Sequence, residues 1–343
     1  MTVEEDDYDH DHDLHASWKR LSFSVRNDTR DAIANNEPIE EKLHVVMVIS
    51  NPCFYKKRYL LAQEFIRRME EEPDVLLYIV EMVYGSQKYF LTSPTDPTHL
   101  QLRATHPLWH KENMINLGIR TLLPSTWKAV AWIDADVEFE SHTWASDTLR
   151  ILNGYKDIVQ LFSQAIDMNY DRTAMSVFTS GGFHQEKKHV FQTDSNRGIN
   201  YWHPGFAWAC TRRAYERCMG GGLFDRSILG SGDYYMMMAI LNQSSATPLI
   251  GSLPVSTMKT LRYGYTPGII RHYFHGMKKN RKYSERWKIL RDYQFSFSEH
   301  MTYDEQGVIV PSSTCPPGLL RDILHYFYER NEDDYLFKGP SDS

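Results

Sequence analysis

The chain has 343 residues, of which 42% are apolar, and a formal net charge of -6 at pH 7. This apolar content is enough for a full hydrophobic core, so one large domain with appendages is expected. The acidic balance argues against a protein that gathers nucleic acid through its overall charge. No apolar run reaches the roughly 18 residues that span a bilayer, and the N-terminus is acidic, so no transmembrane segment and a cytoplasmic location are expected.

The N-terminal part of the chain contains a polar tail, then alternating strands and a helix. Residues 1–40 are acidic and histidine-rich, and they hold too few apolar side chains to offset the entropy of ordering, so a disordered tail is predicted. The apolar runs at 43–50, 75–85 and 130–133 predict strands buried on both faces of a parallel sheet. Residues 56–72 predict a helix, because their apolar side chains recur every fourth position beside a charged face.

The rest of the chain continues the alternation with one interruption. A helix is predicted after Ser141, a candidate N-cap, and a strand at 157–162. Periodicity is lost over 167–197, which predicts a long loop. A glycine-bounded turn enters a helix at 230–241, and 317–330 carries apolar residues on one helical face. Together these elements predict an α/β fold with a mostly parallel sheet flanked by helices.

Two aspartates in the segment WIDADVEF are the first candidates for chemistry. Asp134 directly follows a hydrophobic run, which places it at the carboxyl end of a buried strand, where open α/β sheets bind their ligands. Asp134 and Asp136 would repel each other unless a cation lies between them, and their oxygens suit Mg²⁺ or Mn²⁺. The simpler alternative is that both aspartates cap the helix that follows.

The strand–helix–strand start, the WIDADVEF segment, a mid-chain aromatic and glycine-rich block and a late histidine together resemble the GT-A-fold glycosyltransferases. These are metal-dependent enzymes with an Asp-x-Asp motif and a nucleotide-sugar donor. The resemblance covers about 43–291 and selects no family within the superfamily. It implies a GT-A-like, Rossmann-like catalytic domain at 41–300, with 301–343 as a C-terminal extension that carries a brace helix.

The resemblance also implies a metal site. Mn²⁺ (or Mg²⁺) would bind through Asp136, with Asp134 reaching the ribose or the metal shell and a late histidine as third ligand. His272 and His275 lie three residues apart, so either could face the metal, and His275 is favoured because a glycine and a basic run follow it. The alternative for each histidine is packing among its aromatic neighbours.

The donor, expected to be a UDP-sugar, would be held by polar and basic residues. Lys278 and Arg281 lie in the one local concentration of positive charge and would offset the diphosphate, although a solvated helix face explains them equally well. Glu81 ends the second predicted strand and could bind uracil or ribose. Lys111 and Asn116 lie before the metal strand, where similar enzymes hold the nucleotide and the sugar.

An inverting transferase needs a carboxylate that takes the proton of the acceptor hydroxyl. Asp233, after the turn LGSG, is the first candidate base, and its alternative role is a helix N-cap. Asp225 is the second candidate. Aromatic side chains form natural floors for sugars, so the acceptor is expected to contact Tyr201, Trp202 and His203.

These residues predict a metal-dependent enzyme that moves a sugar from a nucleotide sugar to a hydroxyl of a glycan or glycoside, with inversion by Asp233 as a hypothesis. One alternative is a nucleotidyltransferase, but such enzymes usually begin with a glycine-rich phosphate loop, and the stretch after the first strand, NPCFYKKR, lacks glycine. The other is a non-catalytic module of the same fold that binds carbohydrate or nucleotide.

Overall fold

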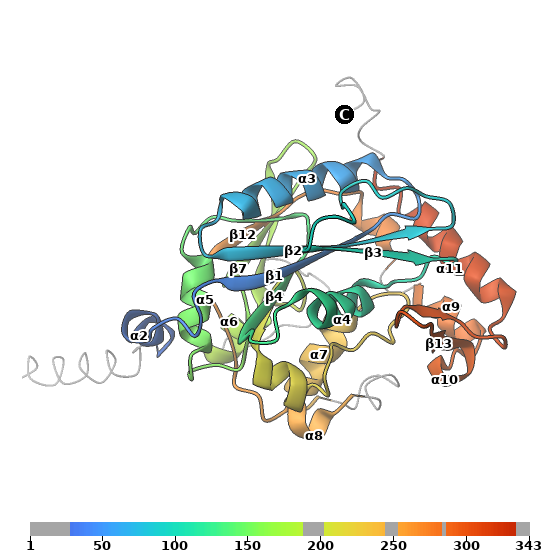
Figure 1. Cartoon of the computed structure of the whole chain (residues 1–343). Coiled ribbons are helices and arrows are strands. Elements are labelled where there is room, and N and C mark those ends of the chain that lie inside the picture. Colours follow the sequence, from blue (N-terminus) through green and yellow to red (C-terminus); the bar gives the residue numbers. More distant parts are fainter. Residues whose placement is uncertain (1–27, 188–201, 244–252, 283–285, 334–343) are drawn as a thin grey trace, which may run out of the picture.

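A seven-stranded sheet forms the centre of the computed structural model, which describes residues 28–187, 202–243, 253–282 and 286–333 (Figure 1). The strand order is β11-β6-β10-β4-β1-β2-β3. Only β10 runs antiparallel to its two neighbours in this sheet, so the predicted mostly parallel α/β sheet is confirmed. The strands are β1 (Leu43–Ser50), β2 (Val75–Tyr84), β3 (His99–Ala104), β4 (Ala129–Ile133), β6 (Ile158–Gln160), β10 (Ala207–Thr211) and β11 (Tyr263–Tyr265).

Helices cover both faces of this sheet because its central strands are apolar on both sides. Along β1, Val45 and Met47 pack on one face and Val46 on the other. Helices α3 (Lys56–Glu71) and α5 (Trp144–Leu152) bury their apolar stripes against the first face, and α4 (Lys111–Leu122) and α7 (Gly232–Ile240) cover the second (Figure 1). The sheet is therefore the middle of three layers. The carboxyl ends of its central strands lie near the N-termini of α4 and α7.

A second, five-stranded sheet occupies part of the region predicted as a loop, so the prediction of a loop over 167–197 is wrong for its first part. Strands β7 and β8 pair antiparallel through a tight turn. Strand β8 has no buried apolar run, because its side chains before Ser180 are exposed or partly exposed, so periodicity could not reveal it. The remainder, 188–201, lies outside the described residues. The strands are β5 (Val137–Phe139), β7 (Gln164–Met168), β8 (Ala174–Ser180), β9 (Trp202–His203) and β12 (Ile269–His272).

The ordered chain begins before the predicted boundary at residue 41. Helix α2 (Asp28–Asn35) lies within the expected tail and packs against α5. The backbone N–H of Ile39 donates to Leu149 O at 3.1 Å, and Arg150 Nη1 donates to Asn36 O at 2.9 Å. The tail prediction is therefore wrong for residues 28–40, while 1–27 lie outside the described residues.

The C-terminal elements form a third apolar cluster with the domain. Helix α11 (Pro317–Glu329) matches the predicted brace helix and buries Leu319 and Ile323 against Leu108 and Leu290. None of the described helices is long and apolar enough to cross a membrane. The remaining elements are α6 (Gly181–Lys187), η1 (Ala214–Cys218), α8 (Val255–Met258), η4 (Lys278–Arg281), α9 (Arg286–Asp292), α10 (Phe297–His300), β13 (Met301–Tyr303) and β14 (Ile309–Pro311).

Candidate active site

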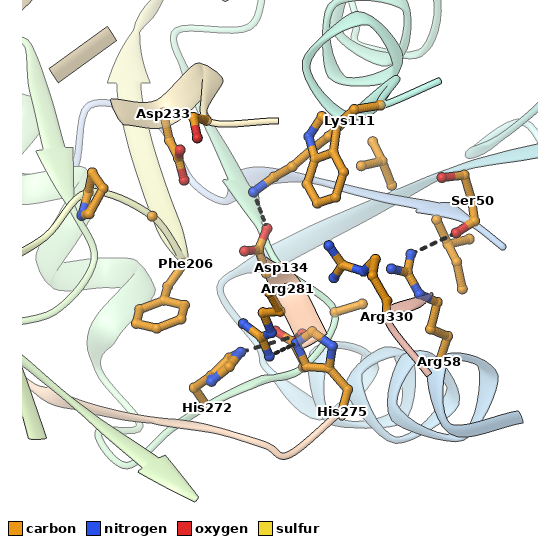
Figure 2. Close-up of a pocket in the computed structure, with 18 of the residues that line it drawn as sticks. Ser50, Arg58, Lys111, Asp134, Phe206, Asp233, His272, His275, Arg281 and Arg330 are labelled. Atoms are coloured by element: carbon orange, nitrogen blue, oxygen red, sulfur yellow. Dashed lines mark hydrogen bonds and ion pairs between the residues drawn. The ribbon is translucent and has the colours of Figure 1, made fainter. Parts of the chain in front are cut away.

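A cavity of about 620 Å³ opens where β1 and β4 end (Figure 2). Ser50 closes β1 at its rim, and Asp134 directly follows β4. Lys111 and Asp233 reach it from the first turns of α4 and α7. The carboxyl ends of neighbouring parallel strands and the starts of two helices therefore converge on one space, as in ligand sites of open α/β sheets.

Asp136, His272 and His275 form a cluster at the floor of this cavity that could hold a metal ion. One ligand atom from each lies within 4.8 Å of the others. Asp136 Oδ2 is 2.9 Å from His275 Nε2 and 3.6 Å from His272 Nε2. The register brings them together, because β12 pairs with β5, which starts at Val137, and the N–H of Tyr273 donates to Asp136 O at 2.8 Å.

The hydrogen-bonding pattern of this cluster fits a bound cation. Asp136 Oδ1 is buried and has no hydrogen-bond partner among the described residues. His275 Nε2 is 2.9 Å from both Asp136 Oδ2 and Arg281 Nη2. A protonated Nε2 would point its N–H at the arginine donor, and an unprotonated one would point its lone pair at the carboxylate. A cation that accepts both lone pairs removes this conflict, so the residues present fit a divalent metal.

Asp167 orients His272 from behind. Its Oδ1 lies 2.6 Å from His272 Nδ1, so Nε2 is left facing Asp136, the carboxylate–histidine arrangement that supports many metal ligands. Burial opposes a charge on His272, but Asp136 and Asp167 outweigh it and raise the pKa of His272 to about 9. Burial also disfavours an ionised Asp136, yet the two histidines hold its pKa well below its usual range.

Two basic residues expected at a diphosphate line the cavity but already have partners. Lys278 pairs with Asp167 and lies 4.7 Å from the ring centre of Phe178. Arg281 contacts His275. Binding of a diphosphate by Lys278 and Arg281 remains a prediction.

Asp134 lies outside the three-residue cluster. Its Oδ1 pairs with Lys111 Nζ at 2.5 Å. Burial raises the pKa of Asp134, with Lys111 opposing that shift. Burial opposes the charge on Lys111 too, but Asp134 and Asp233 outweigh it and raise the pKa of Lys111 above its usual value. The structure thus groups Asp136 with the histidines and Asp134 with Lys111, where the sequence suggested two aspartates around one cation.

Asp233 lines the cavity on the first turn of α7. The N-cap of that helix is Ser231, so the alternative role of Asp233 as N-cap is not what the structure shows. Its Oδ1 accepts a hydrogen bond from the N–H of Tyr234 at 2.8 Å. Its Oδ2 faces Gly205, where an added Cβ would lie only 2.5 Å away. One oxygen of Asp233 is therefore held and the other is directed to the cavity wall.

Two residues predicted to bind the donor are structural instead. Glu81 is 1% exposed, and its carboxylate accepts the backbone N–H groups of residues 90–92. Asn116 is buried in α4 and bonds to both N and O of Leu223 and to the hydroxyl of Tyr215. Both lie outside the cavity lining, because they satisfy backbone groups that the fold would otherwise bury without partners.

The second candidate base and part of the acceptor set also lie away from the cavity. Asp225 accepts hydrogen bonds from Asn113 Nδ2 at 3.2 Å and from the hydroxyl of Tyr303 at 2.9 Å. Trp202 is 8% exposed and belongs to the apolar core, so its expected contact with the acceptor is wrong. Tyr201 lies outside the described residues. His203 lines the cavity as expected.

Sequence reasoning missed a buried ionic group that the C-terminal segment contributes. Glu332 is 2% exposed and accepts hydrogen bonds from Arg58 Nε at 2.5 Å and from Arg330 Nε at 2.8 Å. Its Oε2 lies 3.8 Å from His275 Nδ1. Arg58 and Arg330 line the cavity (Figure 2). No local sequence pattern predicts this group, because 274 positions separate Arg58 from Glu332.

Replacing Glu332 with glutamine is expected to lower the free energy of unfolding by about 3 kcal/mol, because the buried Arg330 and the partly buried Arg58 lose their shared counter-charge. Urea denaturation measures the change. Glu329→Gln is the matched control, since Glu329 pairs with Lys282 at a site where both side chains are about one-third exposed. Equal stability losses in the two variants would contradict a special role for Glu332.

Glu112, on the first turn of α4, is a buried carboxyl group. It is 5% exposed, and its Oε2 has no hydrogen-bond partner among the described residues. Burial raises the pKa of Glu112 to about 8, with Lys111 opposing that shift and Asp233 adding to it. The fold therefore favours the protonated form of this side chain.

A pH-dependent stability follows from Glu112. Its folded-state pKa lies above the unfolded value of about 4.3, so its stabilising contribution is complete below about pH 4 and is lost as the pH rises through 8. Glu112→Gln cannot ionise, so we expect it to be more stable than wild type by on the order of 2 kcal/mol at pH 8 and by much less at pH 5. Urea denaturation at both pH values tests this, with the exposed Glu71→Gln as control. A difference that does not grow with pH would contradict the buried, protonated carboxyl.

Comparison with protein-family models finds no match, and comparison with curated proteins finds none either. Several solved structures have a similar arrangement. A Drosophila β-1,4-galactosyltransferase 7 mutant in complex with manganese, UDP-Gal and xylobiose has a TM-score of 0.39 and 10% identity, over 82% of this chain and 98% of that one. A Pyrobaculum calidifontis mannosyltransferase in complex with GDP-Man and Mn²⁺ has a TM-score of 0.37 and 13% identity, over 88% and 75%.

The inositol-1-phosphate CTP transferase of T. maritima has a TM-score of 0.31 and 8% identity, over 68% of this chain and 89% of that one. Structures similar to this chain thus include both sugar transferases and a nucleotidyltransferase. Because these TM-scores lie below 0.5, the support for a function has to come from the geometry of the cavity itself.

Proposed function

We propose that this protein is a divalent-metal-dependent glycosyltransferase that moves a sugar from a nucleotide sugar, expected to be a UDP-sugar, to a hydroxyl of a glycan or glycoside. The observation that carries the proposal is the presence in one cavity of a two-histidine, one-carboxylate cluster and a separate carboxylate, Asp233. The cluster could hold a cation that neutralises the departing diphosphate, and Asp233 could accept the proton of the attacking hydroxyl.

On the donor side, Asp136, His272 and His275 would hold the cation. Two imidazoles favour Mn²⁺ over Mg²⁺, because Mg²⁺ prefers oxygen ligands and keeps its waters. A cation bound there would neutralise part of the negative charge of the leaving diphosphate. Lys111 and Arg281 add positive charge around the same space.

On the acceptor side, Asp233 would act as the base. The acceptor oxygen forms a bond to the anomeric carbon, and the bond from that carbon to the phosphate oxygen breaks. The electron pair of that bond leaves with the nucleoside diphosphate, and Asp233 takes the proton of the acceptor hydroxyl. Direct displacement of this kind inverts the anomeric configuration.

The test is turnover of a panel of nucleotide sugars by the purified protein, with and without Mn²⁺ and with glycoside acceptors. We expect Mn²⁺-dependent release of a nucleoside diphosphate from one donor. Release of pyrophosphate from a nucleoside triphosphate and a sugar phosphate would instead identify a nucleotidyltransferase. Binding of a donor with Mn²⁺ but no turnover with any acceptor would identify a binding module.

A further inference from the structure

His203, Gly205 and Phe206 form a shelf between the metal cluster and Asp233, here named the His203–Phe206 shelf. All three residues line the cavity. The rings of His203 and Phe206 stack with centres 3.9 Å apart and planes 4° apart, and the ring centre of Phe206 lies 4.6 Å from that of His272. Figure 2 shows Phe206 between Asp233 and His272.

The backbone around the shelf fixes the position of one proton on His203. The N–H of Gly205 donates to His203 Nδ1 at 3.0 Å, so Nδ1 must be the acceptor nitrogen. Burial lowers the pKa of His203 to about 3, so the ring is neutral and its single proton lies on Nε2. Among the described residues, Nε2 has no hydrogen-bond partner, although the ring lines the cavity. His203 therefore offers one oriented N–H donor to a ligand.

The shelf has a close approach at Gly205 and an unusual backbone conformation at Phe206. A Cβ on Gly205 would lie 2.5 Å from Asp233 Oδ2 and 3.1 Å from His203 Cε1, so only glycine lets the carboxylate and the imidazole pack this closely against the backbone. Phe206 has a φ of 80°, a left-handed conformation that is strained in a residue other than glycine. Its carbonyl accepts the N–H of Asp134 at 2.8 Å, which ties the shelf to the end of β4.

We propose that the His203–Phe206 shelf is the subsite for the transferred sugar, and that His203 Nε2–H donates a hydrogen bond to one hydroxyl oxygen of that sugar. This inference rests on the proposed function. The shelf lies between His272 of the metal cluster, where the diphosphate would bind, and Asp233, where the acceptor hydroxyl would lose its proton (Figure 2). Apolar rings in the cavity wall beside an oriented N–H match a sugar, which has apolar faces and a rim of hydroxyls. His203 is then a specificity residue for the donor, where the sequence suggested contact with the acceptor.

The experiment compares the donor that the wild type uses with its monodeoxy analogues, one for each sugar hydroxyl. In the wild type, one analogue is expected to lose roughly 10- to 100-fold in kcat/KM, because the buried N–H is left without a partner. His203→Phe keeps a ring against Phe206 but has no N–H. In this variant, kcat/KM for the natural donor is expected to fall by a similar factor, and kcat/KM for that analogue should then equal the value for the natural donor. His203→Gln, whose amide N–H lies near the position of Nε2, is expected to recover part of the discrimination.

The affinity for the nucleoside diphosphate with Mn²⁺ provides the second readout and should stay unchanged in His203→Phe. His325→Phe, at a site whose side chain is 72% exposed, is the control for a histidine-to-phenylalanine change. A His203→Phe variant that still disfavours the same analogue overturns the subsite while glycosyl transfer stands. If His203→Phe lost as much affinity for the nucleoside diphosphate as it lost in kcat/KM, the subsite would be overturned as well. A wild type that turns over no nucleotide sugar overturns the proposed function, and the subsite with it.

Discussion

Replacing Asp136 with alanine is expected to lower kcat/KM for sugar transfer by at least about a thousand-fold, which corresponds to about 4 kcal/mol of transition-state stabilisation. Asp136 is the carboxylate that faces both His272 and His275, so its loss removes the one negative ligand of the cluster. The same change should abolish Mn²⁺ binding. Transfer assays and titration calorimetry with Mn²⁺ measure the two effects on the same protein.

Asp134→Ala provides the sharpest comparison, because it removes a neighbouring carboxylate that pairs with Lys111 and lies outside the cluster. We expect it to weaken Mn²⁺ binding less than about tenfold, whereas His272→Gln and His275→Gln should each weaken it by about tenfold or more. If Asp134→Ala abolished Mn²⁺ binding while Asp136→Ala retained it, the two aspartates would have exchanged roles. Full activity in both histidine variants would mean that neither histidine is a required metal ligand.

The sequence predicts well those strands and helices whose own residues carry a clear apolar pattern. The strand expected at 43–50 has the observed bounds, and the helices expected at 56–72 and 317–330 differ from them by one residue at the C-terminal end. Strand β3 and strand β8 have mixed, partly exposed side chains, and the hydrogen bonds that make them strands come from β2 and β7. Because few of their side chains are buried, these two strands have little apolar periodicity of their own.

The site residues also divide into those that a local pattern predicts and those that it does not. Asp136, His272 and His275 could be named because a carboxylate after a buried strand and a late pair of histidines are local patterns. Glu81 and Asn116 follow equally suggestive patterns, but both satisfy buried backbone groups. A polar residue near a strand end can serve a ligand or the backbone, and the choice depends on loops that pack against it from elsewhere in the chain.

The supporting residues could not be predicted, because they act through tertiary contacts. Asp167 reaches His272 across 105 positions, from the end of β7, where the predicted loop would begin. Glu332 lies just after the helix expected to serve only as a brace, and it joins the cavity residues Arg58 and Arg330. The C-terminal extension is therefore part of the site's framework as well as its support.

Asp233→Asn is expected to lower kcat for sugar transfer by about 10²- to 10⁴-fold, the usual contribution of a general base. The amide keeps the size of the side chain and an oxygen for the N–H of Tyr234, but it cannot take the proton of the acceptor hydroxyl. The metal cluster is untouched, so the dissociation constant of the nucleotide sugar with Mn²⁺ should change by less than about threefold. Steady-state kinetics and calorimetry on the same variant separate the two quantities.

Asp225→Asn is the matched control, because it makes the same chemical change at the other candidate base. Asp225 is bound to Asn113 and Tyr303 outside the cavity, so its variant should lose stability and keep its transfer rate. A loss of rate in Asp225→Asn with normal rate in Asp233→Asn would reverse the assignment. Normal rates in both variants would mean that neither aspartate acts as the base. The anomeric configuration of the product, read by NMR, then decides the mechanism, because direct displacement with Asp233 as base must invert it.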